Sequence, residues 1–476
     1  MDYSKPLDEG NNITLGLAMY RPATATKGVL FFNPGGSDAG AVVPWQAALN
    51  LTDSFVGLEE FDLMAMDVRG TYSSNQLNVS LSTFDGILGP YPTTNEEFEN
   101  FKAASATVIQ SWIDSSTPPG IIQHVGTVEV IQDYEMIRKA LGYEKISFLG
   151  DSYGSFRATQ YAVAYPQRVN RFVLDAVVPH GRNLSDQAKD NIAALNRGIL
   201  RADAYCQNNA SCPFHSEGQG SVPRAFKAIL ESATQAPLNA SCAPACITPV
   251  TPFDIRQGMS NALMDSPDFP TLLDELYEVL HGGDASFFAT FHVPNVEDVV
   301  SLALECGDYD YVRDFETFNQ SLSEGLQNDT NDIGVTTAWQ IQLWCSGWPF
   351  PIPASTSSAL TTTANMLLVT SDFDASAPTE WATFTWSQLP NSTLVVRHGD
   401  DHVSFPLVHQ PSTILTKEFL NTGVSPNAGE DQTLVSVYTP GMVRASISDP
   451  YDVPTGAQAG DVNSDGFAQF NGDGAV

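Results

Sequence analysis

Long apolar runs, basic side chains and cysteine are all scarce in this sequence of 476 residues. No run approaches the roughly 18 apolar residues that a membrane-spanning helix needs, so we expect no membrane partner. The chain has 22 Lys and Arg against 55 Asp and Glu, which gives a formal net charge of −33. So large a negative charge argues against nucleic acid or an anionic membrane surface as a partner.

The few cysteines, six in all, are confined to residues 206–345. Their even number favours disulfides. Metal binding is disfavoured because there is no C-x-x-C and no histidine at ligand spacing near them. Near the C-terminus, GDVNSDG (460–466) begins like a calcium loop, but Gly472 stands where the closing glutamate should be. We therefore predict no metal and no cofactor. The most economical of many possible pairings is Cys206–Cys212, Cys242–Cys246 and Cys306–Cys345.

N-x-S/T sequons, by contrast, are abundant: nine occur, where composition alone would give roughly four. With the disulfides, this excess predicts a secreted protein that carries N-linked glycans. The first residues, MDYSKPLDEG, lack the apolar core of a signal peptide, so we expect that any signal was removed or precedes this start. The sequon asparagines are Asn12, Asn50, Asn78, Asn183, Asn209, Asn239, Asn319, Asn328 and Asn391.

Strand and helix patterns alternate at both ends of the chain, which is typical of an α/β fold with a mostly parallel sheet. Residues 1–180 and 346–425 are the predicted two parts of this core. Between them, residues 181–345 carry helical patterns and all the cysteines, and we interpret them as an inserted helical cap. Residues 426–476 are rich in Gly, Asp and Pro, and are predicted to form a poorly ordered acidic tail.

The motif GDSYG places Ser152 between a predicted strand and a predicted helix. KISFL (145–149) resembles a buried strand, and apolar side chains then recur at helical spacing as far as Pro166. A nucleophilic serine on a tight strand-to-helix turn requires this context, with glycines where a Cβ would not fit. Chance alone gives G-x-S-x-G in roughly one chain in five of this length. The prediction of a nucleophile therefore depends on the context more than on the motif.

Catalysis by serine also needs a base and an acid that orients the base, in the chain order Ser, acid, His for an α/β-hydrolase. Two later strand patterns supply candidates where they end. Asp372 and Asp374 follow the first, and His398 and His402 follow the second. We favour His402 as the base because it lies in the loop, whereas His398 is close enough to belong to the strand. The pattern alone does not choose between the two acids.

Several segments, in order, resemble the proline iminopeptidase and tripeptidyl aminopeptidase group of α/β-hydrolases. They are DYSKP, NPGGSDAG, DVRGTYSS, GDSYG, SDFDASAPTEWA and HGDDH, with ALECGD and CSGWP in the cap. The resemblance covers about residues 2–425. It implies an α/β-hydrolase fold: a mostly parallel central sheet flanked by helices, an inserted mainly helical cap and a TAP-like C-terminal region.

Carried over to this sequence, the resemblance implies Ser152 as the nucleophile, Asp374 as the acid and His402 as the general base. The family's acid stands in a D-x-x-x-P context. Asp374 satisfies this pattern with Pro378, and Asp372 does not. The resemblance thus decides between the two acids that the strand pattern left open.

For the oxyanion hole, the resemblance implies the backbone N–H groups of Tyr153 and of Gly36 or its neighbour Gly35. Two departures from the family pattern lie in the same loops. Ser37-Asp38 replaces the usual Pro-Gly after NPGG, and Tyr72 replaces the second glycine of D-x-R-G-x-G. These changes affect the expected shape of the pocket and the substrate preference, not the chemistry.

The resemblance further implies a serine exopeptidase that cleaves from free peptide N-termini through an acyl-enzyme. Such an enzyme must bind a charged amine, and a buried carboxylate of the cap would do so. Asp308, at the family's C-x-D position, and Glu305 are the candidates, and a Cys306–Cys345 bridge would hold this segment against the core. The alternative is a carboxylic-ester or lactone hydrolase, which would use the same triad on a small acyl substrate without an acidic anchor.

Overall fold

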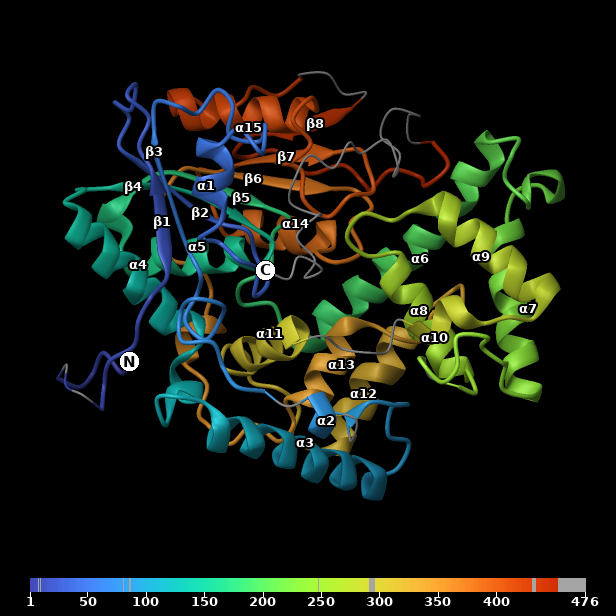
Figure 1. The fold of residues 1–476 in the computed structure, drawn as a ribbon. Helices are drawn as coiled ribbons and strands as arrows, with labels where there is room; N and C mark the ends of the chain where they lie inside the picture. The colour runs from blue at the N-terminus through green and yellow to red at the C-terminus, as the bar shows by residue number, and fades with distance from the viewer. Residues whose placement is uncertain are drawn as a thin grey trace.

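An eight-stranded sheet forms the centre of the protein in the computed structural model (Figure 1). The structure describes residues 1–452 except 7, 9, 80, 85–86, 247, 291–295 and 430–433. In space the strands follow the order β1-β3-β2-β4-β5-β6-β7-β8, with β1 and β8 antiparallel to their neighbours and the rest parallel. The strands are β1 (Leu17–Tyr20), β2 (Val29–Asn33), β3 (Asp62–Met66), β4 (Ile146–Asp151), β5 (Val169–Asp175), β6 (Met366–Ser371), β7 (Thr393–Arg397) and β8 (Val435–Tyr438).

Helices cover both faces of this sheet, as the apolar strands require. The inner strands β2, β4, β6 and β7 are buried at every position, because parallel strands need cover on both sides. Helices α4, α5 and α14 pack on one face, and α1 and α15 on the other (Figure 1). Their bounds are α1 (Val43–Ala48), α4 (Thr127–Leu141), α5 (Tyr153–Ala164), α14 (Thr379–Ser387) and α15 (Pro411–Thr422). The predicted α/β-hydrolase core is confirmed.

The segment 181–345 is helical, as predicted, and in its described part the only β structure is two isolated bridges. Most of its helices surround a hydrophobic core of their own, which we name the cap core (Ile192, Phe226, Leu272, Phe318 and their neighbours). In Figure 1, α6–α9 lie to the right of the sheet and α11–α13 below it. The helices are α6 (Leu184–Asn208), α7 (Ser221–Gln235), α8 (Pro252–Ala262), α9 (Phe269–Gly282), α10 (Ser286–Thr290), α11 (Val296–Cys306), α12 (Phe315–Leu326) and α13 (Thr337–Trp344).

Two segments lie elsewhere than the sequence suggested. Helix α3 (Asn95–Ser115) precedes the predicted cap but contributes Phe98 to the cap core, where its ring lies 6.2 Å from that of Phe318. Short helix α2 (Leu81–Phe84) precedes it. Strand β8 lies beyond residue 425, where we expected the core to end, so the sheet extends at least to Tyr438. The remainder of the predicted tail, from 453 onward, lies outside the described residues.

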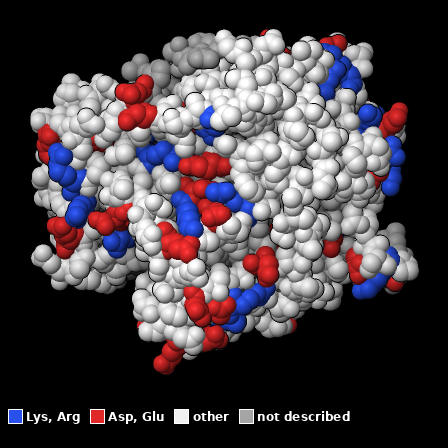
Figure 2. All heavy atoms as spheres, turned by 180° about the vertical axis from the view of Figure 1, so that it is seen from behind, with Lys and Arg blue, Asp and Glu red and all other residues white. Residues whose placement is uncertain are grey.

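Many of the few cations in the described part of the chain lie beside anions. Figure 2 shows basic side chains next to acidic ones in small groups on the face it presents. Lys189, for example, lies 2.7 Å from Glu324, and Arg197 lies 2.9 Å from Glu380. In the part of the chain described here, no helix combines the length and the apolar character needed to cross a membrane.

Candidate active site

Ser152 lies on a strained turn between β4 and α5, with φ 51° and ψ −124°, a conformation that side-chain sterics disfavour. The two glycines beside Ser152, Gly150 and Gly154, stand where a side chain would collide with the backbone. A Cβ on Gly150 would come within 2.3 Å of the Gly154 carbonyl oxygen, and one on Gly154 within 2.4 Å of the Asn33 carbonyl oxygen. The strand–turn–helix context predicted for Ser152 is therefore present, with the hydroxyl at the carboxyl end of a central strand.

The structure brings together the three side chains that the sequence singled out. The Oγ atom of Ser152 lies 2.8 Å from Nε2 of His402, and Nδ1 of His402 lies 2.8 Å from Oδ2 of Asp374. They follow three different parallel strands, β4, β7 and β6, whose carboxyl ends meet at one edge of the sheet. This row of hydrogen bonds is the arrangement that nucleophilic catalysis by serine uses.

Asp374 is held in place for this contact. It is fully buried, and its second oxygen accepts hydrogen bonds from the backbone N–H groups of Ser376 and Ala377, each 2.8 Å long. These bonds fix the carboxylate so that one oxygen faces the imidazole. The carboxylate is thereby oriented before any substrate binds.

Asp372, the rival acid, belongs to another network. Its carboxylate lies 2.6 Å from Nδ1 of His398 and accepts hydrogen bonds from Arg444 and Ser448, each 3.0 Å long. Although burial opposes ionisation, His398 and Arg444 lower the pKa of Asp372. Asp372 thus fastens the segment after β8 to the core, and it is not the partner of His402.

Negative charges around His402 stabilise its protonated form. Burial lowers its pKa, but Asp374, Asp265 and Asp175 outweigh burial and raise that pKa from 6.5 to about 9. An imidazole accepts the serine proton only when it is neutral. We therefore expect the site to work best on the alkaline side of neutrality.

We expect kcat/KM to rise with pH along a limb that lies above the ordinary histidine value of about 6.5. Asp265→Asn should move this limb to lower pH without abolishing turnover, because it removes one negative charge near His402 and keeps the backbone contact. Asp114→Asn, at an exposed position on α3, is the matched control and should leave the profile unchanged. A wild-type limb at or below pH 6.5 would show that these acids do not control His402.

The loop after β2 lies directly against the nucleophile turn. Gly35 has φ 106°, and a Cβ there would come within 2.7 Å of both the Asp151 carbonyl oxygen and Cβ of Ser152. Tyr153 opens α5, where backbone N–H groups have no partner within the helix. The predicted oxyanion donors, Gly36 and Tyr153, thus lie on two segments in contact beside Ser152.

Asp308 is buried, and both of its carboxylate oxygens are filled from within the protein. One accepts the backbone N–H of Thr127 at 2.7 Å, and the other accepts the hydroxyls of Thr127 (2.6 Å) and Tyr153 (2.8 Å). Arg157 lies 4.9 Å from the centre of the same tyrosine ring. This geometry argues against the predicted contact of Asp308 with a substrate amine. Its carboxylate instead fixes Tyr153, the residue next to the nucleophile.

Glu305, the second predicted amine ligand, lies at the end of α11 and is half-buried. Burial and the charge of Asp308 raise its pKa to about 7, although Arg157 and Ser301 act in the opposite direction. A carboxyl in this state gains from a nearby cation, because the cation stabilises its charged form. Glu305 stays a candidate for binding an amine.

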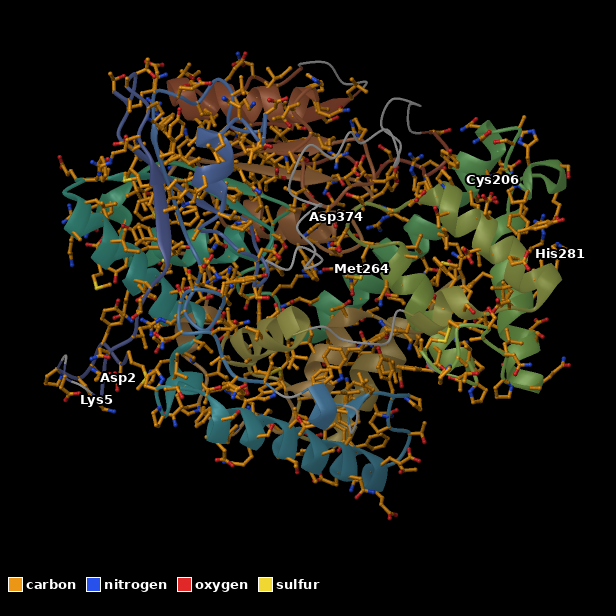
Figure 3. All side chains as sticks on the ribbon, viewed as in Figure 1. Asp2, Lys5, Cys206, Met264, His281 and Asp374 are labelled. Carbon is orange, nitrogen blue, oxygen red and sulfur yellow. A yellow bond between two sulfur atoms is a disulfide. The ribbon has the colours of Figure 1, made fainter. Side chains whose placement is uncertain are left out.

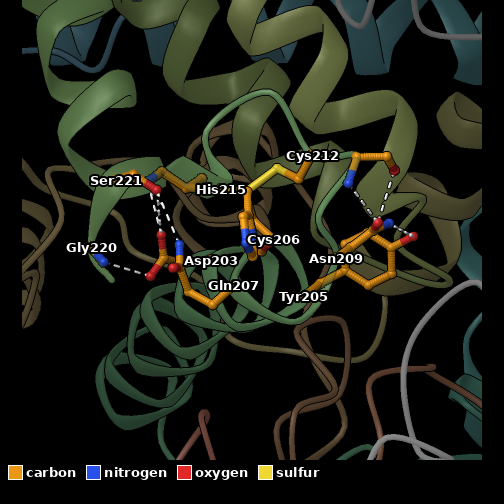
Figure 4. The surroundings of a disulfide bond; sticks show 11 residues. Asp203, Tyr205, Cys206, Gln207, Asn209, Cys212, His215, Gly220 and Ser221 are labelled. Carbon is orange, nitrogen blue, oxygen red and sulfur yellow. Dashed lines mark hydrogen bonds between the residues drawn. A yellow bond between two sulfur atoms is a disulfide. The ribbon is translucent and has the colours of Figure 1, made fainter. Parts of the chain in front are cut away.

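All three predicted disulfides are present. Cys306–Cys345 joins the end of α11 to the end of α13, within the hydrophobic cluster of the main core. The segment that carries Glu305 is therefore tied to the core, as expected. Cys206–Cys212 closes the turn after α6 (Figure 4). Nearby, Asp203 accepts hydrogen bonds from the backbone N–H of Gly220 and the hydroxyl of Ser221 at the start of α7.

A second contact between the cap and the catalytic loops has no signal in the sequence. Between α8 and α9, the carbonyl of Asp265 accepts the backbone N–H of His402 at 2.7 Å, and its carboxylate accepts the hydroxyl of Ser376 at 2.9 Å. Figure 3 shows Met264, the preceding residue, across from Asp374. A lone acid in a polar loop carries no motif, so only the fold reveals this contact.

A parallel sheet with a serine on the turn after a central strand, and its histidine and acid after later strands, defines the class of α/β-hydrolases. A family model for the alpha/beta hydrolase fold matches residues 28–233, and one for TAP-like protein matches residues 330–432. The chain has the α/β-hydrolase fold, and its C-terminal part is TAP-like. The resemblance to the proline iminopeptidase and tripeptidyl aminopeptidase group is confirmed.

Two curated relatives agree with this assignment. The chain is 23% identical over 449 residues to the tripeptidyl aminopeptidase of Streptomyces coelicolor, covering 89% of this chain and 80% of that protein. It is 30% identical over 224 residues to serine protease Hip1 of Mycobacterium tuberculosis, covering 46% of this chain and 42% of that protein. The chain thus spans less than half the length of the latter. A solved proline iminopeptidase from Mycobacterium smegmatis is 13% identical, with a TM-score of 0.34, over 86% of this chain and 95% of its own.

Proposed function

We propose that the protein is a secreted serine exopeptidase that releases single residues or short peptides from free N-termini. The observation that carries this proposal is the bonded row of Ser152, His402 and Asp374 at the end of the parallel strands. The relatives named as a serine protease and a tripeptidyl aminopeptidase support a peptide as the substrate.

In the proposed mechanism, Oγ of Ser152 attacks the carbonyl carbon while Nε2 of His402 takes its proton. Asp374 holds the Nδ1–H of the imidazole and stabilises the imidazolium that forms. The backbone N–H groups of Tyr153 and Gly36 stabilise the developing oxyanion. His402 then protonates the leaving amine, and the remaining acyl-enzyme is hydrolysed by a water molecule that His402 deprotonates.

We assign recognition of the substrate amine to Glu305 in place of Asp308. Glu305 lies one helical turn from Asp308, which in turn bonds to Tyr153 beside the nucleophile. A protonated amine near Glu305 would receive a charge-assisted hydrogen bond, and the ionised carboxylate would gain a partner. Asp308 and Thr127 would hold the wall of this subsite in shape.

Blocked peptides should be poorer substrates than free ones by roughly a hundredfold or more in kcat/KM, because acetylation leaves the half-buried Glu305 carboxylate without its partner. Glu305→Gln should reduce that discrimination and leave hydrolysis of a small neutral ester nearly unchanged. Asp310→Asn is the matched control, since its side chain is 79% exposed. Chromogenic peptides with free and acetylated termini measure the ratio, and full discrimination in the Glu305→Gln variant would contradict the assignment.

A carboxylic-ester or lactone hydrolase is the second candidate. It is favoured by the state of Asp308, whose two oxygens already accept hydrogen bonds from Thr127 and Tyr153. The triad would serve this chemistry equally well. Similar rates on acetylated and free peptides, together with faster hydrolysis of esters, would establish this alternative.

Secretion with N-linked glycans is part of the proposal. The three disulfides support an oxidising compartment. Eight of the nine sequon asparagines are exposed, and the other, Asn209, is half-buried. These positions are accessible to glycosylation without unfolding of the core.

A further inference from the structure

Two buried acids lie side by side directly behind the nucleophile turn. Asp151 ends β4 and Asp175 ends β5, and the two residues are paired in the parallel register of these strands. Register partners in adjacent strands lie roughly 4.8 Å apart and project to the same face of the sheet. The backbone N–H of Ser152 also donates to the carbonyl of Asp175 at 2.9 Å. The nucleophile turn is therefore attached to β5 at this pair.

Asp175 also holds the loop that carries the histidine. Its Oδ2 atom accepts the backbone N–H groups of Ser404 at 3.0 Å and Phe405 at 2.6 Å, two and three residues after His402. Arg397, at the end of β7, and His402 are the cations that face this carboxylate. The Asp175 side chain thus contacts the loop that carries His402, and its strand lies beside β4, which leads to Ser152.

Such a pair cannot carry two negative charges at low cost. Asp151 is 2% exposed and Asp175 is fully buried, and among the described residues an oxygen of each, Oδ1, has no hydrogen-bond partner. Burial and the charge of Asp175 raise the pKa of Asp151 well above its usual range. Burial raises the pKa of Asp175 to about 6, against the bonds from Ser404 and Phe405. One proton on the pair leaves a single buried negative charge instead of two.

We propose that Asp151 and Asp175 share one proton, with Asp151 protonated and Asp175 charged, and that this pair positions the His402 loop against Ser152. The inference rests on the proposed roles of Ser152 and His402. Asp175 acts as a positioning residue whose charge also bears on the imidazole. Protonation of Asp151 avoids a second buried negative charge next to Asp175.

Two isosteric variants distinguish the charged partner from the neutral one. Asp175→Asn removes a negative charge near His402, so the pH limb of activity should move down by roughly one pH unit. Asp151→Asn replaces a protonated, neutral carboxyl with a neutral amide, so the pH limb of activity should stay in place. The rate of labelling by a fluorophosphonate probe, measured against pH, reports the limb without any assumption about the substrate. Equal shifts in both variants, or no shift in either, would overturn the proposal.

Thermal stability tests the shared proton independently of catalysis. A carboxyl whose pKa is raised by folding stabilises the protein below its unfolded pKa of about 3.9, and this stabilisation is lost as pH rises toward the folded pKa. The Tm of Asp151→Asn relative to wild type should therefore increase steadily from pH 5 to pH 8. A constant difference would contradict a shared proton even if Asp175→Asn does not fold. Labelling that persists in Ser152→Ala would instead refute the proposed nucleophile and leave this stability test standing.

Discussion

Replacing Ser152 with alanine should abolish turnover, with a loss of roughly 10⁶-fold in kcat. Alanine removes the only atom in the row that can attack a carbonyl carbon, and it leaves His402 and Asp374 in contact. The backbone of the turn should be retained, because its geometry is set by Gly150 and Gly154. Hydrolysis of a chromogenic peptide measures the loss, and circular dichroism checks the fold.

A matched control is an exposed serine away from the sheet edge, such as Ser358. Ser358→Ala should retain wild-type kcat. If Ser152→Ala retained more than a few per cent of the activity, another residue would be the nucleophile, and the whole assignment of the site would be wrong.

Asp374→Asn should lower kcat on the order of 10⁴-fold, because asparagine leaves the imidazole in the wrong tautomer to accept the serine proton. Asp372→Asn should affect stability instead. It leaves Arg444, whose side chain is 8% exposed, without its carboxylate partner, and breaking such a pair costs about 3 kcal/mol or more. Steady-state kinetics and thermal unfolding of the two variants, measured side by side, separate these effects.

The opposite pattern, with a large kinetic loss in Asp372→Asn and a small one in Asp374→Asn, would contradict the arrangement of the triad. The two acids lie two residues apart on one loop. The comparison therefore controls for general disturbance of that loop.

The catalytic row could be predicted because its members are local signals that the fold brings together. Ser152 stands between a buried strand and a helix, and Asp374 and His402 each follow a strand. In a parallel sheet, strand ends of this kind meet at one edge. The order of the motifs along the chain was enough to select the strands. The disulfides were predicted because close spacing in sequence limits which cysteines meet.

Other features depend on contacts between distant segments and could not be predicted. Asp308 occupies the expected motif position, but Thr127 and Tyr153 satisfy its carboxylate, and neither carries a sequence signal for that contact. Strand β8 follows a polar stretch that resembles a tail, yet it completes the edge of the sheet. The contact of Asp265 with the His402 loop needs the cap in place. In each case, tertiary structure sets contacts that no local sequence pattern indicates.

Mapping the fluorophosphonate adduct by peptide mass spectrometry tests whether Ser152, activated by His402, is the nucleophile of this α/β-hydrolase. We expect one adduct, on Ser152, whose formation slows as the pH falls and His402 becomes protonated. An adduct on a different serine, or none at any pH in the folded protein, would contradict it.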